Sequence, residues 1–422
     1  MSRIRVIILG AGGRGLNAYG EYLAKFAPDF EVVGAADPLP ARLEYAKRLF
    51  PDIPSNRLVS DWRQLLDCGK IADAAIITTM EPLHAPIAIA AAGVGYHILL
   101  EKPMAPTEQA CRDIVTAVKK ARVIFAVCHV LRYTPFYRAI HELLAEGRIG
   151  QIVHVQHFED VAYWHHTHSF VRGYNNNGDK TSFMLLSKSC HDIDILRYLI
   201  GRRCQRVQSF GSLMHFRRES KPREAGEAKR CHDCAYEPRC PYSTLKMYVR
   251  DRIATGNGGW MTGGLTKDQT VAGVTEALRT SPIGRCVYEC DNNVVDHQIV
   301  NLEYDGGVTA GFTMSGFTEG GRRTIVQGTE GILRAELDGG RVRWLDFLTD
   351  TWHEVEASKL RGVIEEGHGG GDYGLMAEWT QALRTGDGSH IITGPDESLE
   401  THITTFAAER SRLNGTVETI AY

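Results

Sequence analysis

The sequence predicts an α/β protein in which an N-terminal Rossmann domain precedes a C-terminal α/β domain with an open, largely antiparallel sheet. Apolar runs typical of buried strands alternate with helical patterns over residues 4–129, as in a doubly wound parallel sheet. The alternation then stops, and glycine-rich turns at residues 305–307 and 338–340 indicate hairpins between antiparallel strands. We therefore assign residues 1–128 to the first domain and residues 129–422 to the second.

The second domain is expected to present the open face of its sheet to the cleft between the domains. Helical patterns at residues 372–384 and 397–413 are expected to pack back onto the body of the protein. A polar run without periodicity begins at residue 217, and we assign residues 217–290 to an insertion that carries several cysteines.

The composition is that of an ordinary globular protein and argues against several classes of partner. The 422 residues, 43% of them hydrophobic, suffice for two or three domains with sizeable cores. With 48 Lys and Arg against 51 Asp and Glu, the formal charge of -3 is too balanced to favour nucleic acid or a membrane surface as a partner. The apolar run at residues 6–10 is too short for a signal sequence or a membrane span, so a cytoplasmic location is expected.

A glycine-rich loop directly follows the first predicted strand. It has the pattern G-x-G-x-x-G and lies between a buried strand at residues 4–9 and a helical pattern at residues 17–26. This is the context of a dinucleotide-binding loop, whose glycines permit a tight turn and the close approach of a pyrophosphate to the helix N-terminus. The candidate cofactor-binding residues are Gly10, Gly12, Gly13, Arg14 and Gly15.

Three further residues are expected to contact the cofactor. Asp37 ends the second predicted strand, 22 residues after Gly15, where a carboxylate can accept hydrogen bonds from the adenosine ribose. Arg42 could in principle hold a 2′-phosphate, but Asp37 would repel one, so NAD is favoured over NADP. Asp37 could also cap the following helix, and the two roles are compatible. Thr79 and His84 lie past a later strand end, although His84 could equally be a helix-start residue.

The apolar strand predicted at residues 97–100 runs directly into Glu101, Lys102 and Pro103. Ligands of open parallel sheets bind beyond the carboxyl ends of the strands, so Glu101 and Lys102 are expected to lie beside the ligand. The alternative is a solvated Glu-Lys turn that ends at the proline. The dinucleotide motif upstream favours the position in the cleft.

These motifs resemble the Gfo/Idh/MocA family, the relatives of glucose-fructose oxidoreductase and inositol dehydrogenase, in the glycine loop, Asp37, Thr79 with His84, and Glu101-Lys102-Pro103. The resemblance implies an NAD-dependent enzyme that oxidises a secondary hydroxyl of a sugar, glycoside or cyclitol. It also implies a homodimer or homotetramer assembled through the sheet. Within the site, it implies that Lys102 lies near the nicotinamide and the reacting carbon, and that Glu101 contacts the nicotinamide-ribose side of the cofactor.

A second candidate catalytic group lies in the helical pattern that starts at Ser187. His191 and Asp194 are three residues apart and would share a helix face, so we place Asp194 on the substrate side, where it could orient the imidazole as a proton acceptor. The resemblance implies the same role for His191, but Ser187 stands where the family commonly has Asp. Lys102, Lys188 and His191 could therefore share the proton transfer. The alternative is a capping Ser187 and a histidine satisfied within its own helix.

Residues 161–172 combine aromatic rings, imidazoles and a cation more densely than any other stretch. The spacing H-H-x-H fits neither a strand face nor a helical pair in full, so contacts to a sugar are a more economical interpretation than a catalytic metal. Arg172 would be available for an acidic substituent, and Tyr163 for proton transfer. A loop of mixed polarity is the alternative. The candidate substrate residues are Trp164, His165, His168 and Arg172.

The cysteines of the insertion have the spacing C-x2-C-x5-C, formed by Cys231, Cys234 and Cys240. Cys286, or Cys290, could supply a fourth ligand. Closed structural zinc sites take four Cys or His ligands, and in a reducing compartment clustered cysteines favour metal over disulfides. The sequence thus indicates a structural zinc ion on Cys231, Cys234, Cys240 and Cys286, with unliganded buried thiols as the alternative.

Other activities are compatible with the same residues. Some relatives in the family cleave glycosides by transient oxidation, elimination, water addition and re-reduction, and Tyr163 with the bases around His191 would suit the extra proton transfers. A regulator that binds a nucleotide without catalysis is a third hypothesis. Asp296, His297 and His368 are further residues expected near the cleft.

Overall fold

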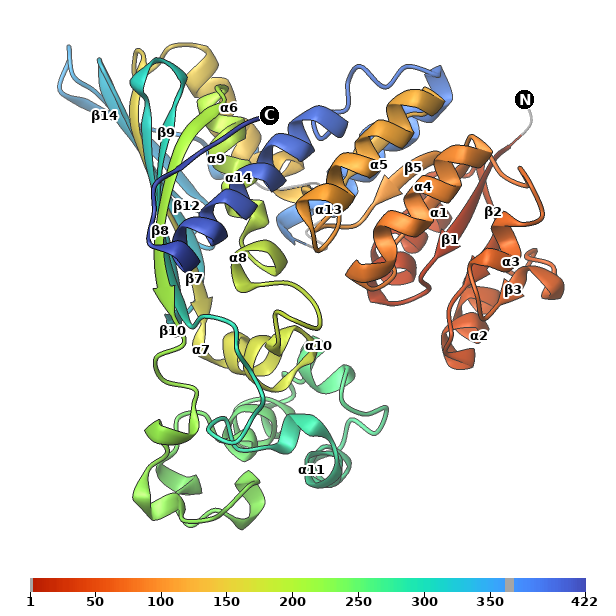
Figure 1. Cartoon of the computed structure of the whole chain (residues 1–422), viewed down its shortest axis with the longest axis vertical. Coiled ribbons are helices and arrows are strands. Elements are labelled where there is room, and N and C mark those ends of the chain that lie inside the picture. The colour runs from red at the N-terminus through yellow and green to blue at the C-terminus, as the bar shows by residue number, and fades with distance from the viewer. Residues whose placement is uncertain (1–2, 361–367) are drawn as a thin grey trace.

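The computed structural model describes residues 3–360 and 368–422, which form two domains built on two sheets (Figure 1). The first sheet is entirely parallel and has the order β3-β2-β1-β4-β5-β6. This is the doubly wound arrangement that the sequence predicts. Its strands are β1 (Ile4–Leu9), β2 (Phe30–Ala36), β3 (Leu58–Val59), β4 (Ala74–Ile77), β5 (His97–Leu100) and β6 (Phe125–Val127).

Helices cover both faces of this sheet, which explains why its strands are continuously apolar. Ile7 and Leu9 of β1 pack in one core with α3, α4 and α5, whereas Val6 and Ile8 pack on the other face in a core that includes Trp379 of α13. The helices are α1 (Glu21–Phe26), α2 (Pro40–Leu49), α3 (Arg63–Leu66), α4 (His84–Val94), α5 (Glu108–Ala121) and, from the far end of the chain, α13 (Gly371–Thr385).

The second sheet is mixed and largely antiparallel, in the order β14-β13-β12-β11-β7-β10-β9-β8-β15. The pair β7–β10 is parallel, and the other pairs are antiparallel. The strands are β7 (Ile152–Ala162), β8 (Cys204–Ser212), β9 (His297–Tyr304), β10 (Thr309–Thr318), β11 (Gly321–Gly328), β12 (Gly331–Glu336), β13 (Arg341–Asp346), β14 (Thr351–Glu354) and β15 (Glu418–Thr419).

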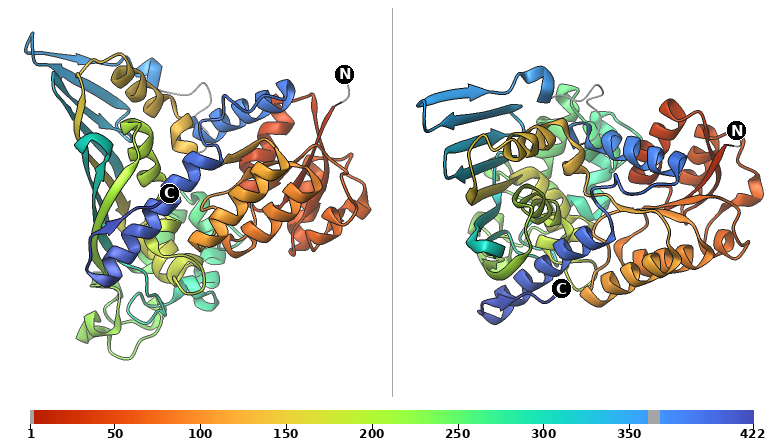
Figure 2. Two further views of the ribbon diagram at one scale, coloured as in Figure 1. Left: turned by 45° about the horizontal axis from the view of Figure 1, so that its top comes forward. Right: turned by 90° about the horizontal axis from the view of Figure 1, so that it is seen from above.

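Three helices lie between this sheet and the Rossmann domain: α6 (Pro135–Ala145), α9 (Cys190–Ile200) and α14 (Pro395–Asn414) (Figures 1 and 2). Their apolar stripes share one core with the inward residues of the sheet, and α14 also packs on α5. The expectation that the open face looks onto the cleft is therefore wrong. The face toward the cleft is covered, because amphipathic helices bury it, and the open face points away from the Rossmann domain.

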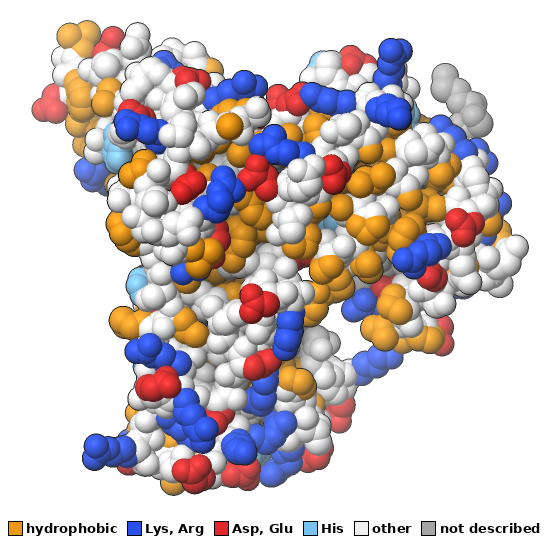
Figure 3. All heavy atoms as spheres, in the orientation of Figure 1, with side chains coloured by type: hydrophobic (Ala, Val, Ile, Leu, Met, Phe, Trp, Pro, Cys, Tyr) orange, Lys and Arg blue, Asp and Glu red, His pale blue; other side chains and the backbone are white. Residues whose placement is uncertain are grey.

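The insertion between β8 and β9 forms short helical elements that extend below the sheet beside α7 (Tyr163–His166) (Figure 1). The remaining helices are α8 (Met184–Ser187), α10 (Gly259–Gly263), α11 (Val271–Thr280) and α12 (Ala357–Leu360). Figure 3 shows acidic and basic side chains interspersed over the visible face. Among the described helices, none combines the length and apolarity that crossing a membrane requires.

Candidate active site

The glycine loop forms a close-packed turn at the carboxyl end of β1. Gly10 has φ of 99°, and a Cβ there would lie 2.5 Å from the carbonyl of Thr78. A Cβ on Gly15 would lie 2.1 Å from the carbonyl oxygen of Gly10 and 2.6 Å from Oγ1 of Thr78. Gly13 has open space beside it, since no atom of residues 3–360 and 368–422 lies within 4 Å of its added Cβ. The loop thus has the close backbone packing that a bound pyrophosphate requires, and these residues fit a dinucleotide.

A cavity of about 290 Å³ adjoins this loop at the ends of β1, β2 and β4. Asp37 lines it and is 3% exposed; its Oδ1 accepts the backbone N–H of Leu39 at 2.9 Å, and its Oδ2 pairs with Arg42 at 3.1 Å. Asp37 therefore caps the following turn and also faces the cavity. Trp62 and Leu83 supply apolar walls that suit an adenine ring.

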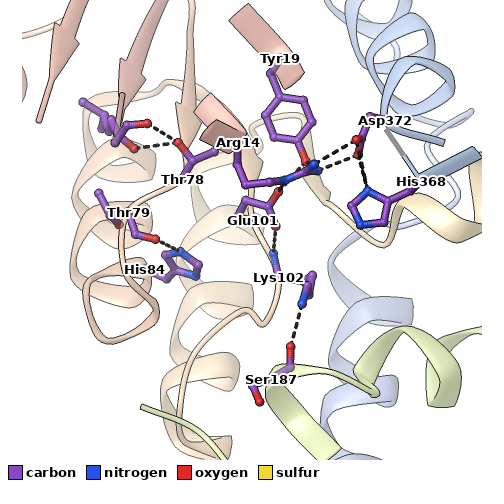
Figure 4. Close-up of polar contacts among 12 residues, drawn as sticks. Arg14, Tyr19, Thr78, Thr79, His84, Glu101, Lys102, Ser187, His368 and Asp372 are labelled. Carbon is purple, nitrogen blue, oxygen red and sulfur yellow. Dashed lines mark hydrogen bonds and ion pairs between the residues drawn. The ribbon is translucent and has the colours of Figure 1, made fainter. Parts of the chain in front are cut away.

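A second cavity of about 290 Å³ lies at the carboxyl end of β5 and shares Thr78, Thr79 and Met80 with the first. Glu101, Lys102 and His191 line it. The Nζ of Lys102 donates a hydrogen bond of 2.7 Å to the backbone carbonyl of Ser187, as Figure 4 shows. The structure thus places the Glu-Lys pair at the mouth of the cleft rather than on a solvated turn. The other residues that line this second cavity are Arg14, Glu81, His84, Cys128, Tyr174, Asn175, Ser187 and His368.

Glu101 anchors a buried polar network behind this cavity. Its Oε1 accepts hydrogen bonds from Arg14 and Tyr19, each at 2.6 Å, and its Oε2 accepts the backbone N–H of Lys102 at 2.9 Å. Burial alone would raise the pKa of Glu101, but the Arg14 guanidinium lowers it below its usual range. Glu101 thus stays ionised and fixes the backbone from which Lys102 extends.

Asp372, at the start of α13, is a member of the network that the sequence reasoning missed. Arg14 binds its two oxygens at 2.9 and 2.6 Å, and Nδ1 of His368 lies 3.2 Å from Oδ2 (Figure 4). Burial alone would raise the pKa of Asp372, but the hydrogen bonds from Arg14 and His368 hold it well below its usual range. The run His-Gly-Gly-Gly-Asp was the available signal, since three consecutive glycines rarely precede a helix without a packing reason.

His84 contacts both of the loops that line the cavity. Its Nδ1 lies 2.8 Å from the carbonyl oxygen of Pro103, and its Nε2 lies 3.0 Å from that of Thr79. His84 is 1% exposed and begins α4, so it is both a helix-start residue and a positioning residue for the loops. Thr79 has a buried Oγ1 without a partner among the described residues, which is available to a ligand.

The pairing of Asp194 with His191 is wrong. Asp194 accepts two hydrogen bonds of 2.6 Å from Arg132 and one of 3.0 Å from Thr401, and it is 1% exposed. Burial alone would raise the pKa of Asp194, but Arg132 lowers it. His191 shares the helix with Asp194, yet the carboxylate points to a cation on a distant element, and Nδ1 of His191 has no partner in the described part of the chain.

Lys188 does not join Lys102 and His191 either. Its Nζ pairs with Glu159 at 2.9 Å, beside Trp164 and His165 in a separate cavity of about 370 Å³. Adjacent residues in a chain point in different directions, and here Ser187 faces the cofactor side whereas Lys188 faces the sheet. The prediction that the two lysines share one task is thus not supported by their positions.

The stretch 161–172 packs mainly against the insertion. The Tyr163 hydroxyl lies 3.2 Å from Nζ of Lys246, and His168 hydrogen-bonds Tyr248. Burial lowers the pKa of His168 to about 4, so its ring is neutral near pH 7. Trp164 lies under the guanidinium of Arg252, 4.5 Å from its ring centroid. None of these side chains lines the cavity that holds Lys102, which contradicts direct substrate contact there.

Arg172 likewise makes structural contacts and does not line the cavity that holds Lys102. It is 2% exposed and donates hydrogen bonds to the backbone carbonyls of Arg285 at 2.8 Å and Tyr242 at 2.7 Å. These contacts hold the insertion against the preceding helix. Sequence reasoning could not foresee this, because the partners lie 70 and 113 residues downstream.

The four cysteines of the predicted zinc site line one small cavity of about 10 Å³. Nevertheless, over residues 3–360 and 368–422 the structure places no group of three or more His, Cys, Asp or Glu side chains as a metal ion would require. Among the described residues, the four thiols are therefore not arranged as a closed zinc site. The ten cysteines are all free thiols.

Comparisons with known proteins agree with this architecture. Residues 4–129 match the model of an oxidoreductase family described as an NAD-binding Rossmann fold (Gfo/Idh/MocA), and residues 141–419 match that of its C-terminal alpha/beta domain. YteT of Bacillus subtilis, whose name describes it only as an oxidoreductase, is 23% identical over 88% of this chain and 87% of its own. Levoglucosan dehydrogenase of Pseudarthrobacter phenanthrenivorans is 33% identical over 34% of this chain and 36% of its own.

The fold is also shared over the full length of a solved structure. A levoglucosan dehydrogenase in complex with NADH and levoglucosan superposes with a TM-score of 0.71 at 17% identity, covering 100% of both chains. At this level of sequence identity, the similarity shows only that the two proteins share a fold.

Proposed function

The chain belongs to the Gfo/Idh/MocA family of oxidoreductases, and from this premise we propose that it oxidises a secondary hydroxyl of a sugar, glycoside or cyclitol with NAD as the hydride acceptor. Levoglucosan dehydrogenase, an enzyme named for an anhydrosugar, is among the similar proteins and supports a sugar-like substrate.

One observation carries the proposal. The cavity bordered by the glycine loop and Asp37 lies next to the cavity that holds Lys102 and His191, and Thr78, Thr79 and Met80 line both. An extended dinucleotide with its adenosine beside Asp37 would thus bring its other end to Lys102. That end of the site contains polar groups able to handle a hydroxyl proton.

NAD, when bound, supplies the acceptor for the hydride of the carbinol carbon. The residues of the chain supply binding and proton handling. Lys102 is fixed at its backbone by Glu101 and at its Nζ by the carbonyl of Ser187, so its ammonium is held at a defined position beside His191. There it would donate a hydrogen bond to the substrate oxygen and stabilise negative charge as the hydroxyl proton leaves.

The Asp37→Asn variant tests the assignment of the adenosine end. Asparagine keeps an oxygen for the Leu39 N–H, so the local turn should persist, whereas the charged acceptor for the ribose is lost. We expect NAD affinity to fall at least about 10-fold, since hydrogen bonds to a charged group contribute about 1.5–3 kcal/mol, and discrimination against NADP to weaken. Calorimetric titration with both cofactors measures this. The matched control is Asp52→Asn at an exposed site; unchanged affinities in Asp37→Asn would leave Asp37 as a cap only.

We further propose a homodimer or homotetramer that assembles through the open face of the second sheet. Phe210 and Ile299 pair across β8 and β9 on this face and are 52% and 42% exposed, a large exposure for apolar side chains. Sedimentation velocity of Ile299→Glu tests the interface, because a charge there should produce monomers; an unchanged assembly would contradict it.

A cytoplasmic location is proposed from the free thiols.

For the insertion, a structural zinc ion remains a proposal that two observations support. Cys231, Cys234, Cys240 and Cys286 line one cavity, and Arg172 lines it too, with a buried Nη1 that has no partner among the described residues. Thiolates would compensate that cation, but zinc binding would have to draw the thiols closer together than they lie here. Elemental analysis of purified protein decides: stoichiometric zinc supports the proposal, and its absence overturns it.

A further inference from the structure

We propose that His368, oriented by Asp372, is the acid/base residue that exchanges the hydroxyl proton with the substrate. This inference rests on the proposed function and names a residue for it outside the Lys102 and His191 pair. His368 lines the same cavity as Lys102, and its ring centroid lies 6.0 Å from that of His191.

The contact to Asp372 defines the tautomer of His368. Asp372 is 1% exposed and remains ionised, so its carboxylate can only accept hydrogen bonds. Nδ1 of His368, 3.2 Å from Oδ2, must therefore carry the proton. That leaves Nε2 as a proton acceptor on a ring whose side chain is 42% exposed. A histidine whose Nδ1–H is held by a buried carboxylate is oriented for proton transfer through its other nitrogen.

The backbone holds His368 in an unusual conformation. His368 has φ of 46°, and Gly369 and Gly370 follow with φ of 64° and 86°. A Cβ on Gly371 would lie 2.3 Å from the carbonyl oxygen of Val130, so only glycine lets α13 begin this close to the neighbouring turn. Left-handed backbone at a non-glycine residue is costly and concentrates at functional sites. Here it brings the imidazole to the cavity.

Asp372 is fixed in turn by the network behind the cofactor site. Arg14 bridges Asp372 and Glu101, so the position of His368 is coupled to the strand end that carries Lys102 (Figure 4). By contrast, no carboxylate of the described residues pairs with His191, whose Nδ1 has no partner among them. Burial lowers its pKa well below the usual range, and Lys102 and two imidazoles lower it further, which makes His191 a weak base. Three histidines line the cavity, and both ring nitrogens of His84 contact backbone carbonyls. His368 is therefore the one that a described carboxylate orients for proton transfer.

With NAD bound as the hydride acceptor, the carbinol C–H bond would break with both electrons leaving as hydride, and the O–H proton would pass to Nε2 of His368 while the carbonyl double bond forms. The resulting imidazolium is stabilised by the Asp372 carboxylate and then releases the proton to water. In the reverse direction the same imidazolium donates the proton to the alkoxide.

Kinetics of His368→Ala test the proposal on a sugar that the wild type oxidises. We expect kcat to fall about 100-fold with NAD affinity retained, and added imidazole to restore part of the rate. His353→Ala, which removes an exposed histidine stacked on Trp344, is the matched control and should match the wild type. Wild-type kcat in His368→Ala, or a loss that imidazole does not relieve at all, would overturn the proposal.

A second measurement does not depend on turnover. In ¹⁵N NMR of the NAD complex, His368 is expected as the Nδ1–H tautomer, and Asp372→Asn should remove that preference. A wild type that oxidises no sugar in a broad panel contradicts the proposed function; in that case an Nε2–H tautomer for His368 would overturn the pairing, and the Nδ1–H tautomer would support it.

Discussion

Replacing Lys102 with alanine is expected to lower kcat at least about 100-fold while NAD affinity stays nearly unchanged. The expected loss of kcat follows from the position of Lys102. Lys102 extends from the carboxyl end of β5, its Nζ lies 2.7 Å from the Ser187 carbonyl oxygen, and its backbone is held by Glu101, so its ammonium has one defined place in the cavity. The dinucleotide contacts of the glycine loop and Asp37 lie elsewhere and should survive. Steady-state kinetics and calorimetric titration with NAD measure the two effects separately.

The matched control is Lys120→Ala, which removes an exposed lysine from α5 and should leave both quantities at the wild-type level. The structure adds a sharper contrast. Lys188, the other lysine that the sequence suggested, pairs with Glu159 outside this cavity, so its replacement should affect kcat far less. Full turnover by Lys102→Ala would remove this residue from the mechanism.

Replacing Gly15 with alanine is expected to abolish measurable NAD binding and to destabilise the Rossmann domain. The added methyl carbon would lie 2.1 Å from the Gly10 carbonyl oxygen and 2.6 Å from Thr78 Oγ1. A backbone atom cannot move aside as the end of a flexible side chain can, so the loop must shift, at a cost of about 1–3 kcal/mol. Thermal unfolding and NAD titration together separate the stability effect from the binding effect.

Gly13→Ala provides the control within the same loop. A Cβ at Gly13 meets no atom of the described residues within 4 Å, so the fold should retain its wild-type melting temperature. Equal melting temperatures and NAD affinities for Gly15→Ala and the wild type would contradict the close-packed turn.

Much of the first domain could be predicted from sequence because its signals are local. The continuous apolar strands, the glycine loop and Asp37 at the end of β2 each follow from a few neighbouring residues, and the structure has them in the predicted order. The polar end of β5 was predictable for the same reason, since a parallel strand that stops at charged residues places them at the edge where ligands bind.

The features of the fold and the site that the sequence did not predict depend on contacts between distant parts of the chain. The helical spacing that puts His191 and Asp194 on one face says nothing of Arg132, which lies 62 residues earlier and binds the carboxylate. Likewise, Tyr163 and Arg172 contact an insertion whose packing no local pattern describes. The direction of the open sheet face was predicted wrongly, because periodicity identifies a buried face without showing which element buries it.

The contacts around His368 also depend on residues that are distant in the sequence. Its sequence context shows three glycines before Asp372. However, Asp372 contacts Arg14, which lies 358 positions away in the chain. The sequence predicts His368 near the cleft, and the structure places it there. Only the folded chain shows that Asp372 joins Arg14 and Glu101 in one network.

The most direct test of the central claim is the ratio of NADH formed to substrate consumed, measured by NADH absorbance and product chromatography on a panel of sugars, aryl glycosides and cyclitols. The proposed dehydrogenase should form one NADH for each hydroxyl oxidised, with a ketone product. Release of an aglycone without net NADH would contradict it and would assign the chain to the redox-neutral glycoside hydrolases instead.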